Sequence, residues 1–420
     1  MRVLHISTRL ILGGSQENTV LSCEGQAERG YEVHLAFGPI FGPEGSMLDR
    51  VEAFRTSNGQ TIRTHELPNL VREVDPRKDH RCWSRDLRRL LQETRPDVVH
   101  THSSKAGVLG RWAAWLTRDE GRPRPAVVHT IHGPPFMPVE GPPHARVATR
   151  LKNGLYAAAE RFAALRCDVI VAVADAMTEQ FLARRIGEPD KYVTVRSGME
   201  TRRFVEAPPG ETRDDARREL GLGPEHFVVG TVARLAQHKG HDDLIDALAD
   251  DLRAHEYWRL LWVGDGWWRD RLVDRLAREG LRDRVVLAGL VPPERVPMMV
   301  RAMDVLAHPS AREGLPRTVP QALLCGVPAV AYDVDGTREA CLDVDASGDR
   351  ATGILVRPGD TRGLRAAVGR LAGDPDLRRR LGEAGRVFAE SEFAAEWMVD
   401  QLDEVYALAI ERRNATDARS

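Results

Sequence analysis

The amino-acid sequence predicts an α/β protein built from two doubly wound, Rossmann-like domains that face each other across a cleft. Three observations lead to this prediction. The chain has 420 residues, of which 42% are apolar and 29% are charged, and this length suits two or three domains at about 100 to 200 residues each. Short β-branched runs alternate with longer stretches of helical periodicity. These runs form two separate series along the chain.

The first series predicts a parallel sheet in the N-terminal half. Each run is followed by a stretch with helical spacing of apolar residues, which is typical of parallel strands joined by crossover helices. The strands that we expect are residues 2–7, 32–37, 98–102, 126–132 and 169–174.

The second series predicts a second parallel sheet. Its strands are expected at residues 227–233, 260–264, 285–289, 305–309, 329–332 and 353–356, and Leu244, Leu248 and Leu252 mark one of the helices between them. We therefore expect an N-terminal domain over 1–197 and a C-terminal domain over 198–395. Residues 396–420 are expected to form a helix that returns to the N-terminal domain and ends in a frayed tail.

Composition narrows the classes of function. The formal net charge is −2, with 60 Lys+Arg against 62 Asp+Glu, which argues against nucleic acid as a partner. Five scattered cysteines without a CxxC pair predict neither a disulfide framework nor a zinc site. The sequence shows neither a signal peptide nor a run of 18 apolar residues, so we expect a cytoplasmic protein.

Residues that follow predicted strands are the candidates for function, because ligands of doubly wound sheets bind beyond the carboxyl ends of the strands. Gly13 and Gly14 follow the first strand, where glycines let the backbone approach an anion, and Ser15 could cap the next helix. A plain structural turn is an equally good interpretation, because the pattern is not the dinucleotide fingerprint.

Two cations follow the first strand of the second series. Arg234 and Lys239 stand five positions apart on the loop after residues 227–233. This arrangement suits a diphosphate, whose negative charge must be neutralised as it leaves. A solvated basic loop is the alternative.

The densest group of candidates lies in residues 308–326. Glu313 stands in a glycine-containing loop, and the backbone amides of Gly314, Leu315 and Arg317 precede a predicted helix whose N-terminus attracts anions. The stretch therefore fits an anion whose attached group offers hydroxyls.

Taken together, these motifs resemble those of the family-four retaining glycosyltransferases, two-domain nucleotide-sugar enzymes of the GT-B architecture that are also called glycosyl transferases group 1. The resemblance covers nearly the whole chain, although each segment is weak by itself. The segments are residues 13–15, 100–107, 129–133, 195–199, 230–234, 263–266, 308–326 and 352–356.

The resemblance implies roles for individual residues. His132 and Glu313 would be the catalytic residues, contacting the transferred sugar from opposite sides of the cleft. The first domain would hold the acceptor, and the second would bind the nucleotide sugar. The donor-binding residues that it implies are Gly14, Arg234, Lys239, Gly314, Leu315, Arg317 and Gln321.

Gln321 departs from the family pattern, which has a second glutamate eight positions after the first to hold the nucleotide ribose. An amide can still bond a diol, although it lacks the charge of a carboxylate. Alternatively, Thr318 and Gln321 have the spacing of a capping box. We favour the ribose contact.

We expect no metal and no cofactor. Asp333-Val334-Asp335 and Asp343-Val344-Asp345 have the form of a metal motif from another glycosyltransferase class, but in this architecture cations are already supplied by the two basic side chains. Four histidines near strand ends are expected to form hydrogen bonds rather than to bind zinc, because neither a cysteine nor an acidic residue stands at ligand spacing from them. These four are His100, His102, His129 and His132.

A basic amphipathic helix is expected over 146–166. Its apolar stripe includes Leu151, Leu155 and Phe162, and five basic residues flank it against one Glu160. Such a helix can lie on an anionic membrane as a peripheral contact. We favour the other interpretation, a core helix whose arginines reach the surface.

The function that we expect is retaining, metal-independent transfer of a hexose from a UDP- or GDP-sugar. The acceptor would be a saccharide or a lipid-linked saccharide in polysaccharide or glycan assembly, and the protein would work at the inner face of the membrane. One alternative is a nucleotide-sugar epimerase or hydrolase on the same architecture. Another is a sugar-nucleotide-binding protein without catalytic activity.

Overall fold

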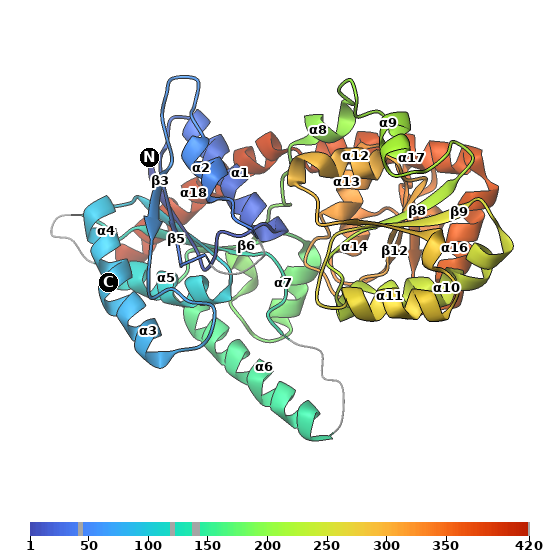
Figure 1. Cartoon of the computed structure of the whole chain (residues 1–420). Helices are drawn as coiled ribbons and strands as arrows, with labels where there is room; N and C mark the ends of the chain where they lie inside the picture. Colours follow the sequence, from blue (N-terminus) through green and yellow to red (C-terminus); the bar gives the residue numbers. More distant parts are fainter. Residues whose placement is uncertain (41–44, 118–121, 137–142, 419–420) are drawn as a thin grey trace. The chain divides into compact units, whose positions relative to one another are not determined.

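The computed structural model describes residues 1–40, 45–117, 122–136 and 143–418. The chain divides into two compact units (Figure 1). Unit 1 contains Met1–Met199 and Ala395–Ser420, and unit 2 contains Glu200–Ala394.

Unit 1 is built on a seven-stranded parallel sheet with the strand order β3-β2-β1-β4-β5-β6-β7. Val3 in the central strand β1 lies opposite Val33 of β2 on one side and Val98 of β4 on the other. The strands are β1 (Arg2–Ser7), β2 (Glu32–Phe37), β3 (Arg63–Glu66), β4 (Val98–His102), β5 (Ala126–Ile131), β6 (Val169–Ala172) and β7 (Tyr192–Thr194).

Helices connect these strands, as the parallel sheet requires. A π-helical segment, Cys82–Leu87, joins α3 to α4. The α-helices of unit 1 are α1 (Gly14–Glu28), α2 (Leu48–Ala53), α3 (Pro76–Arg81), α4 (Arg88–Thr94), α5 (Ser104–Leu116), α6 (Pro143–Ala164), α7 (Asp175–Leu182) and α18 (Ala395–Asp417).

Unit 2 repeats the design with a six-stranded parallel sheet in the order β10-β9-β8-β11-β12-β13. Leu244, Leu248 and Leu252 of α10 are buried in its core, as their helical spacing predicts. The strands are β8 (Phe227–Val232), β9 (Trp258–Val263), β10 (Val285–Gly289), β11 (Val305–His308), β12 (Ala329–Tyr332) and β13 (Gly353–Val356). The helices are α8 (Thr201–Val205), α9 (Arg213–Glu219), α10 (His241–Ala254), α11 (Arg269–Arg278), α12 (Val296–Arg301), α13 (Thr318–Leu324), α14 (Thr337–Ala340), α15 (Val344–Ser347), α16 (Thr361–Gly373) and α17 (Pro375–Glu392).

Two α/β domains, each built on a parallel sheet, are confirmed, and every predicted strand is present. The edge strands β3 and β7 were not predicted. The expected cap by Ser15 is wrong, because α1 begins at Gly14 and its N-terminus has no side-chain cap.

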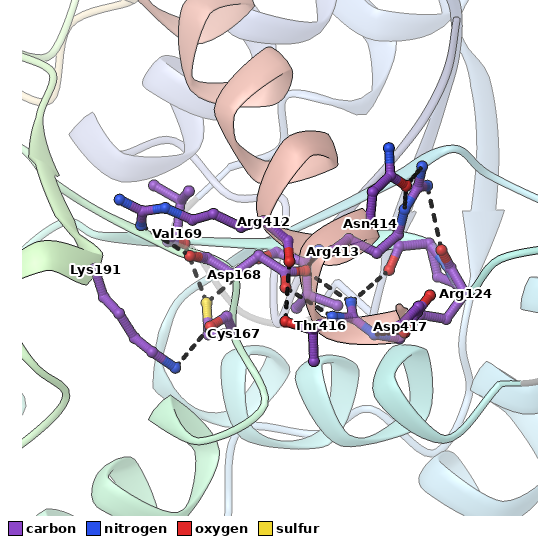
Figure 2. Close-up of polar contacts among 12 residues, drawn as sticks. Arg124, Cys167, Asp168, Val169, Lys191, Arg412, Arg413, Asn414, Thr416 and Asp417 are labelled. Atoms are coloured by element: carbon purple, nitrogen blue, oxygen red, sulfur yellow. Dashed lines mark hydrogen bonds and ion pairs between the residues drawn. The ribbon is translucent and has the colours of Figure 1, made fainter. Parts of the chain in front are cut away.

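The C-terminal helix α18 completes the core of unit 1. Its apolar side chains, among them Val399 and Leu402, join a cluster with Val3, Val98 and Val128 of the sheet. The last turns are held by polar contacts (Figure 2). The guanidinium of Arg412 donates to the carbonyl oxygens of Asp168 at 3.1 Å and Asp190 at 2.7 Å.

A buried ion pair lies beneath this helix end (Figure 2). The guanidinium of Arg124 donates to both carboxylate oxygens of Asp168 at 2.7 Å, and Oδ2 of Asp168 also accepts from the backbone N–H of Val127 at 2.8 Å. The two side chains are 1% and 2% exposed. The bidentate geometry gives both carboxylate oxygens of Asp168 a charged donor.

We predict that Asp168→Ala lowers the free energy of unfolding of unit 1 by about 3 to 5 kcal/mol, because the buried Arg124 charge loses its bidentate partner and keeps only the more distant Asp417 carboxylate at 3.6 Å. Arg365→Ala removes the partly exposed pair of Arg365 with Asp251 and should cost about 1 kcal/mol or less. Urea unfolding measures both. Equal effects of the two substitutions would contradict the importance of the buried pair.

Candidate functional site

In unit 2 the candidate site residues follow two adjacent strands. The sheet order reverses between β8 and β11, which lie side by side. Arg234 and Lys239 stand in the loop after β8, and Glu313 stands in the loop after β11. Loops that follow strands at such a switch point leave a crevice between them, where ligands of this fold class bind.

Backbone contacts hold these two loops together. The N–H of Ala311 donates to the carbonyl oxygen of His238 at 2.8 Å, and the hydroxyl of Ser310 reaches the same oxygen at 3.2 Å. Gly240 has φ +71°, and a Cβ atom built on it would lie 1.9 Å from the carbonyl oxygen of Pro309. Only glycine allows this approach, which places the preceding Lys239 beside the second loop.

The approach creates a cluster around the Glu313 carboxylate. Nζ of Lys239 lies 2.5 Å from Oε1 of Glu313, and Nε2 of His308 lies 3.1 Å from the same oxygen. Nδ1 of His308 contacts the hydroxyl of Thr318 at 3.2 Å. The side chains of Lys239 and Glu313 are 19% and 13% exposed. The cluster is therefore largely buried and can still be reached from one side.

The ionisation of Glu313 depends on this cluster. Burial by itself would raise the pKa of the carboxyl group. The Lys239 ammonium and the hydrogen bond from His308 outweigh burial, and they hold the pKa of Glu313 well below its usual range. Glu313 is therefore an anion at neutral pH, engaged by a cation and an imidazole.

Sequence reasoning missed two residues of this cluster. His308 contacts Glu313 directly, and it could have been found as a polar residue that ends a buried strand. Oδ2 of Asp335 accepts from the backbone N–H of Glu313 at 2.7 Å, so Asp335 positions the loop.

Asp333 pairs with Arg338, and Asp343 caps α15 and accepts from the N–H of Leu355. Asp333, Asp335 and Asp343 of the two Asp-Val-Asp motifs thus have different partners.

Helix α13 begins at Thr318, directly after the Gly314, Leu315 and Arg317 loop. The capping-box alternative for Gln321 is wrong, because Arg317 is the N-cap residue, it makes no side-chain cap bond, and the Thr318 hydroxyl contacts His308 instead. Gln321 is buried at 9% exposure.

The remaining predicted residues are distributed over both units. Arg234 is exposed, with its guanidinium 5.7 Å from the ring centroid of Trp267. Gly14 begins α1, and His132 follows β5, so these two residues belong to unit 1. The predicted histidine hydrogen bonds are present. One of them joins Nδ1 of His102 to Nε2 of His132 at 3.1 Å.

Unit 1 has a cavity of about 660 Å³ at its own switch point, beside the ends of β1 and β4. Thr8 and Ser103 line it, and so do Lys152 and Tyr156 of α6. The charged side chains in its wall are Arg9, Arg72, Lys105, Lys152, Asp79 and Glu160, a formal excess of 4 − 2 = 2 positive charges. The cavity therefore favours an anionic ligand.

Helix α6 extends away from the rest of unit 1 (Figure 1). The favoured core-helix interpretation is wrong, because the apolar stripe is exposed: 67% for Leu151, 73% for Leu155 and 49% for Phe162. Arg146, Arg150 and the other predicted basic residues flank the stripe. Among the described residues, none of the helices is both long and apolar enough to cross a membrane.

Two family models match the chain. Residues 12–203 match Glycosyltransferase Family 4, and residues 212–388 match Glycosyl transferases group 1. The chain is 31% identical to a 2-deoxystreptamine N-acetyl-D-glucosaminyltransferase of Streptomyces fradiae over 337 residues, 78% of this chain and 75% of the relative. It is 34% identical to a D-inositol 3-phosphate glycosyltransferase of Nocardia farcinica over 304 residues, 68% of this chain but only 61% of that protein.

A solved structure has the same fold. Anabaena Alr3699/HepE, crystallised with UDP and glucose, superposes with a TM-score of 0.75 at 20% sequence identity, covering 97% of this chain and 99% of the other.

We predict that Lys239→Met raises the pKa of Glu313 above the value of about 4.3 that is usual for glutamate, because burial, the largest influence on this carboxyl group, is then opposed by His308 alone. If the pKa of Glu313 is higher in the folded than in the unfolded variant, the variant loses stability as pH rises through that folded-state pKa. In wild type the pKa of folded Glu313 is lowered, so its contribution to the free energy of unfolding is constant above about pH 5. The variant should therefore be less stable than wild type by about 2 kcal/mol at pH 8, and by less at pH 5.

Urea unfolding at pH 5 and pH 8 checks this difference. Lys239→Arg keeps the cation and should follow the wild-type pH dependence. A Lys239→Met variant whose deficit is the same at both pH values would show that Lys239 does not control the ionisation of Glu313.

Proposed function

Because the chain belongs to the group 1 glycosyltransferases of family 4, we propose that it transfers a hexose from a nucleoside diphosphate sugar to a saccharide acceptor with retention of configuration. The observation that carries the proposal is the cluster at the switch point of unit 2, where Lys239 lies 2.5 Å from Glu313. A cation and a hydrogen-bonding carboxylate at one point match two adjacent groups of such a donor. One group is the diphosphate, and the other is the sugar that is bonded to it and carries hydroxyl groups.

Arg234 and Lys239 stabilise the diphosphate as it leaves, because its negative charge grows when the bond to the sugar breaks. The backbone amides of Gly314, Leu315 and Arg317 contribute to the same site, and Gly14 of unit 1 keeps the donor-binding role that the family resemblance gives it. The amide of Gln321 bonds the ribose. His132 keeps the role that the family resemblance gives it, a hydrogen bond to the transferred sugar.

Glu313 positions the sugar and is not a nucleophile in this mechanism. Its Oε1 atom already accepts from Lys239 and His308, and these partners reduce its capacity to attack carbon. The acceptor hydroxyl instead attacks the oxocarbenium-like sugar from the face that the diphosphate leaves, which retains the configuration. The leaving diphosphate accepts the proton of the acceptor hydroxyl, so the reaction needs neither a protein nucleophile nor a metal ion.

The acceptor that we propose is an anionic, lipid-linked saccharide. The cavity of unit 1 carries excess positive charge and is partly lined by Lys152 and Tyr156, and these residues belong to the helix that exposes Leu151 and Leu155. One helix thus offers the Lys152 ammonium to a phosphate and an apolar stripe to a lipid surface. A soluble phosphorylated cyclitol is the second candidate, because a D-inositol 3-phosphate glycosyltransferase is among the relatives.

We predict that Arg234→Ala and Lys239→Ala each lower kcat by about 100-fold or more, the usual loss when a group that stabilises developing charge is removed. Arg271→Ala is the matched control, since Arg271 is an exposed cation of the same unit that pairs with Asp242. Initial rates of sugar transfer with UDP- and GDP-sugars measure the effect.

Near-normal rates in both variants would contradict the assignment of the diphosphate site. Rapid and complete turnover of the donor without any acceptor would favour the epimerase or hydrolase, and binding without any turnover would favour a non-catalytic protein. A rate that is lost in chelator and restored by magnesium or manganese would refute metal independence.

We predict that the protein binds vesicles that contain phosphatidylglycerol, and that Leu151→Glu combined with Leu155→Glu weakens this binding by at least about 10-fold. Burial of each leucine side chain in a lipid interface stabilises the bound state by about 1.5 to 3 kcal/mol. Val387→Glu, at an exposed apolar position of unit 2, is the control. Equal sedimentation of the double variant and wild type with vesicles would leave the soluble cyclitol as the candidate acceptor.

A further inference from the structure

Three buried histidines of unit 1 form the centre of a hydrogen-bonded network. One ring nitrogen from each of His5, His100 and His102 lies within 4.8 Å of the others, which resembles a metal site. However, all six ring nitrogens have protein partners within 3.1 Å. The arrangement is therefore complete as a network of hydrogen bonds.

The network begins at His132, the candidate catalytic residue, and runs into the core. Nε2 of His132 lies 3.1 Å from Nδ1 of His102, and Nε2 of His102 lies 3.0 Å from Nδ1 of His5. Nε2 of His5 lies 2.8 Å from Oε1 of Gln26 on α1. His132 is half-buried, whereas the next three members are at most 1% exposed.

The second half of the network returns through the C-terminal helix. Nε2 of Gln26 donates to the hydroxyl of Tyr406 on α18 at 2.9 Å. This hydroxyl lies 2.7 Å from Nδ1 of His100, and Nε2 of His100 lies 2.7 Å from the hydroxyl of Thr130. Helices α1 and α18 thus reach the candidate catalytic residue through side chains alone.

The buried imidazoles are neutral at physiological pH. Burial lowers the pKa of His5 to about 4, and it lowers the pKa values of His100 and His102 well below their usual range. A neutral imidazole has one N–H donor and one lone pair. Each ring must therefore donate through one nitrogen and accept through the other, so the choice at one ring fixes the choice at the next.

We propose that Gln26 and Tyr406 are positioning residues that set which ring nitrogen of His132 carries the proton. This proposal rests on the proposed function, in which His132 bonds the transferred sugar. With the Gln26 carbonyl toward His5, the Nε2–H of His5 donates to Gln26 and its Nδ1 accepts from the Nε2–H of His102. Nδ1 of His102 then accepts from the Nε2–H of His132.

The orientation of one buried amide thereby makes Nδ1 of His132 an acceptor. Turning the Gln26 amide over would reverse every bond as far as His132 and put the proton on Nδ1. Tyr406 is the other partner of this amide. The reversal would require its hydroxyl to donate to Oε1 of Gln26 and to accept from Nδ1 of His100, so the state of Tyr406 is coupled to the orientation of Gln26. The network thus gives α18 a role in the chemistry beyond its role in the core.

The test is 15N NMR of the full chain labelled at histidine, with His132 assigned by the signals that His132→Gln removes. Protonated and unprotonated ring nitrogens have well-separated shifts. We expect one tautomer of His132 in wild type, protonated at Nε2, and a mixture of tautomers in Gln26→Leu and Tyr406→Phe. Tyr192→Phe is the matched control, because this hydroxyl of unit 1 donates to the carbonyl oxygen of Ile186 outside the network.

Kinetics supply the second measurement. Because a wrong tautomer impairs the chemical step more than binding, Tyr406→Phe should lower kcat about 10-fold or more with little change in the KM for the donor, and Tyr192→Phe should change neither. An unchanged His132 tautomer in both network variants would overturn the proposal, whatever their activity. A changed tautomer with unchanged kcat would overturn the positioning role. If wild type transfers no sugar, the proposed function fails while the NMR result still decides the network.

Discussion

Parallel strand order is the constraint on which the rest of the structure depends. In each unit the chain winds outward from one central strand and then crosses to wind the other way, so that β1 and β4, and likewise β8 and β11, are neighbours. Right-handed crossovers then place the connecting helices on opposite faces of the sheet, and the loops after the two central strands diverge. The candidate donor site lies where β8 and β11 meet, and the cationic cavity lies where β1 and β4 meet. At each point the sheet brings together residues that are far apart in the sequence.

Burial imposes a different solution on each kind of polar group. Glu313 and Asp168 are buried as charges, and each is engaged by a cation and a further donor. His5, His100 and His102 of unit 1 are buried without charge, and each of their ring nitrogens has a partner. Both solutions remove the cost of an unsatisfied polar group. Only buried charged groups, such as those around Glu313, can interact electrostatically with a diphosphate. The neutral histidines fix the orientation of their neighbours without adding charge.

Most of the fold could be predicted from the sequence, because the central strands are short, buried runs rich in β-branched residues, even where histidines interrupt them in β1 and β4. The edge strands β3 (RTHE) and β7 (YVT) escaped prediction since they are short and only partly buried. Within the site, position after a strand identified Lys239 and Glu313. It could not reveal Asp335, whose role depends on a contact across 22 residues, nor the need for glycine at position 240, which follows from the nearness of Pro309. The exposed stripe of α6 was misjudged because periodicity shows that one face is apolar and does not show what covers it.

Calorimetric titration with nucleotides tests the central claim, that the cluster at the switch point of unit 2 binds the diphosphate of a sugar donor. UDP and GDP are compared with UMP and GMP on wild type and on Lys239→Met. We expect the preferred diphosphate to bind at least about 10-fold more tightly than its monophosphate, a difference near 1.4 kcal/mol, and we expect Lys239→Met to lose most of this difference. Equal affinity for the diphosphate and the monophosphate in wild type would contradict the account.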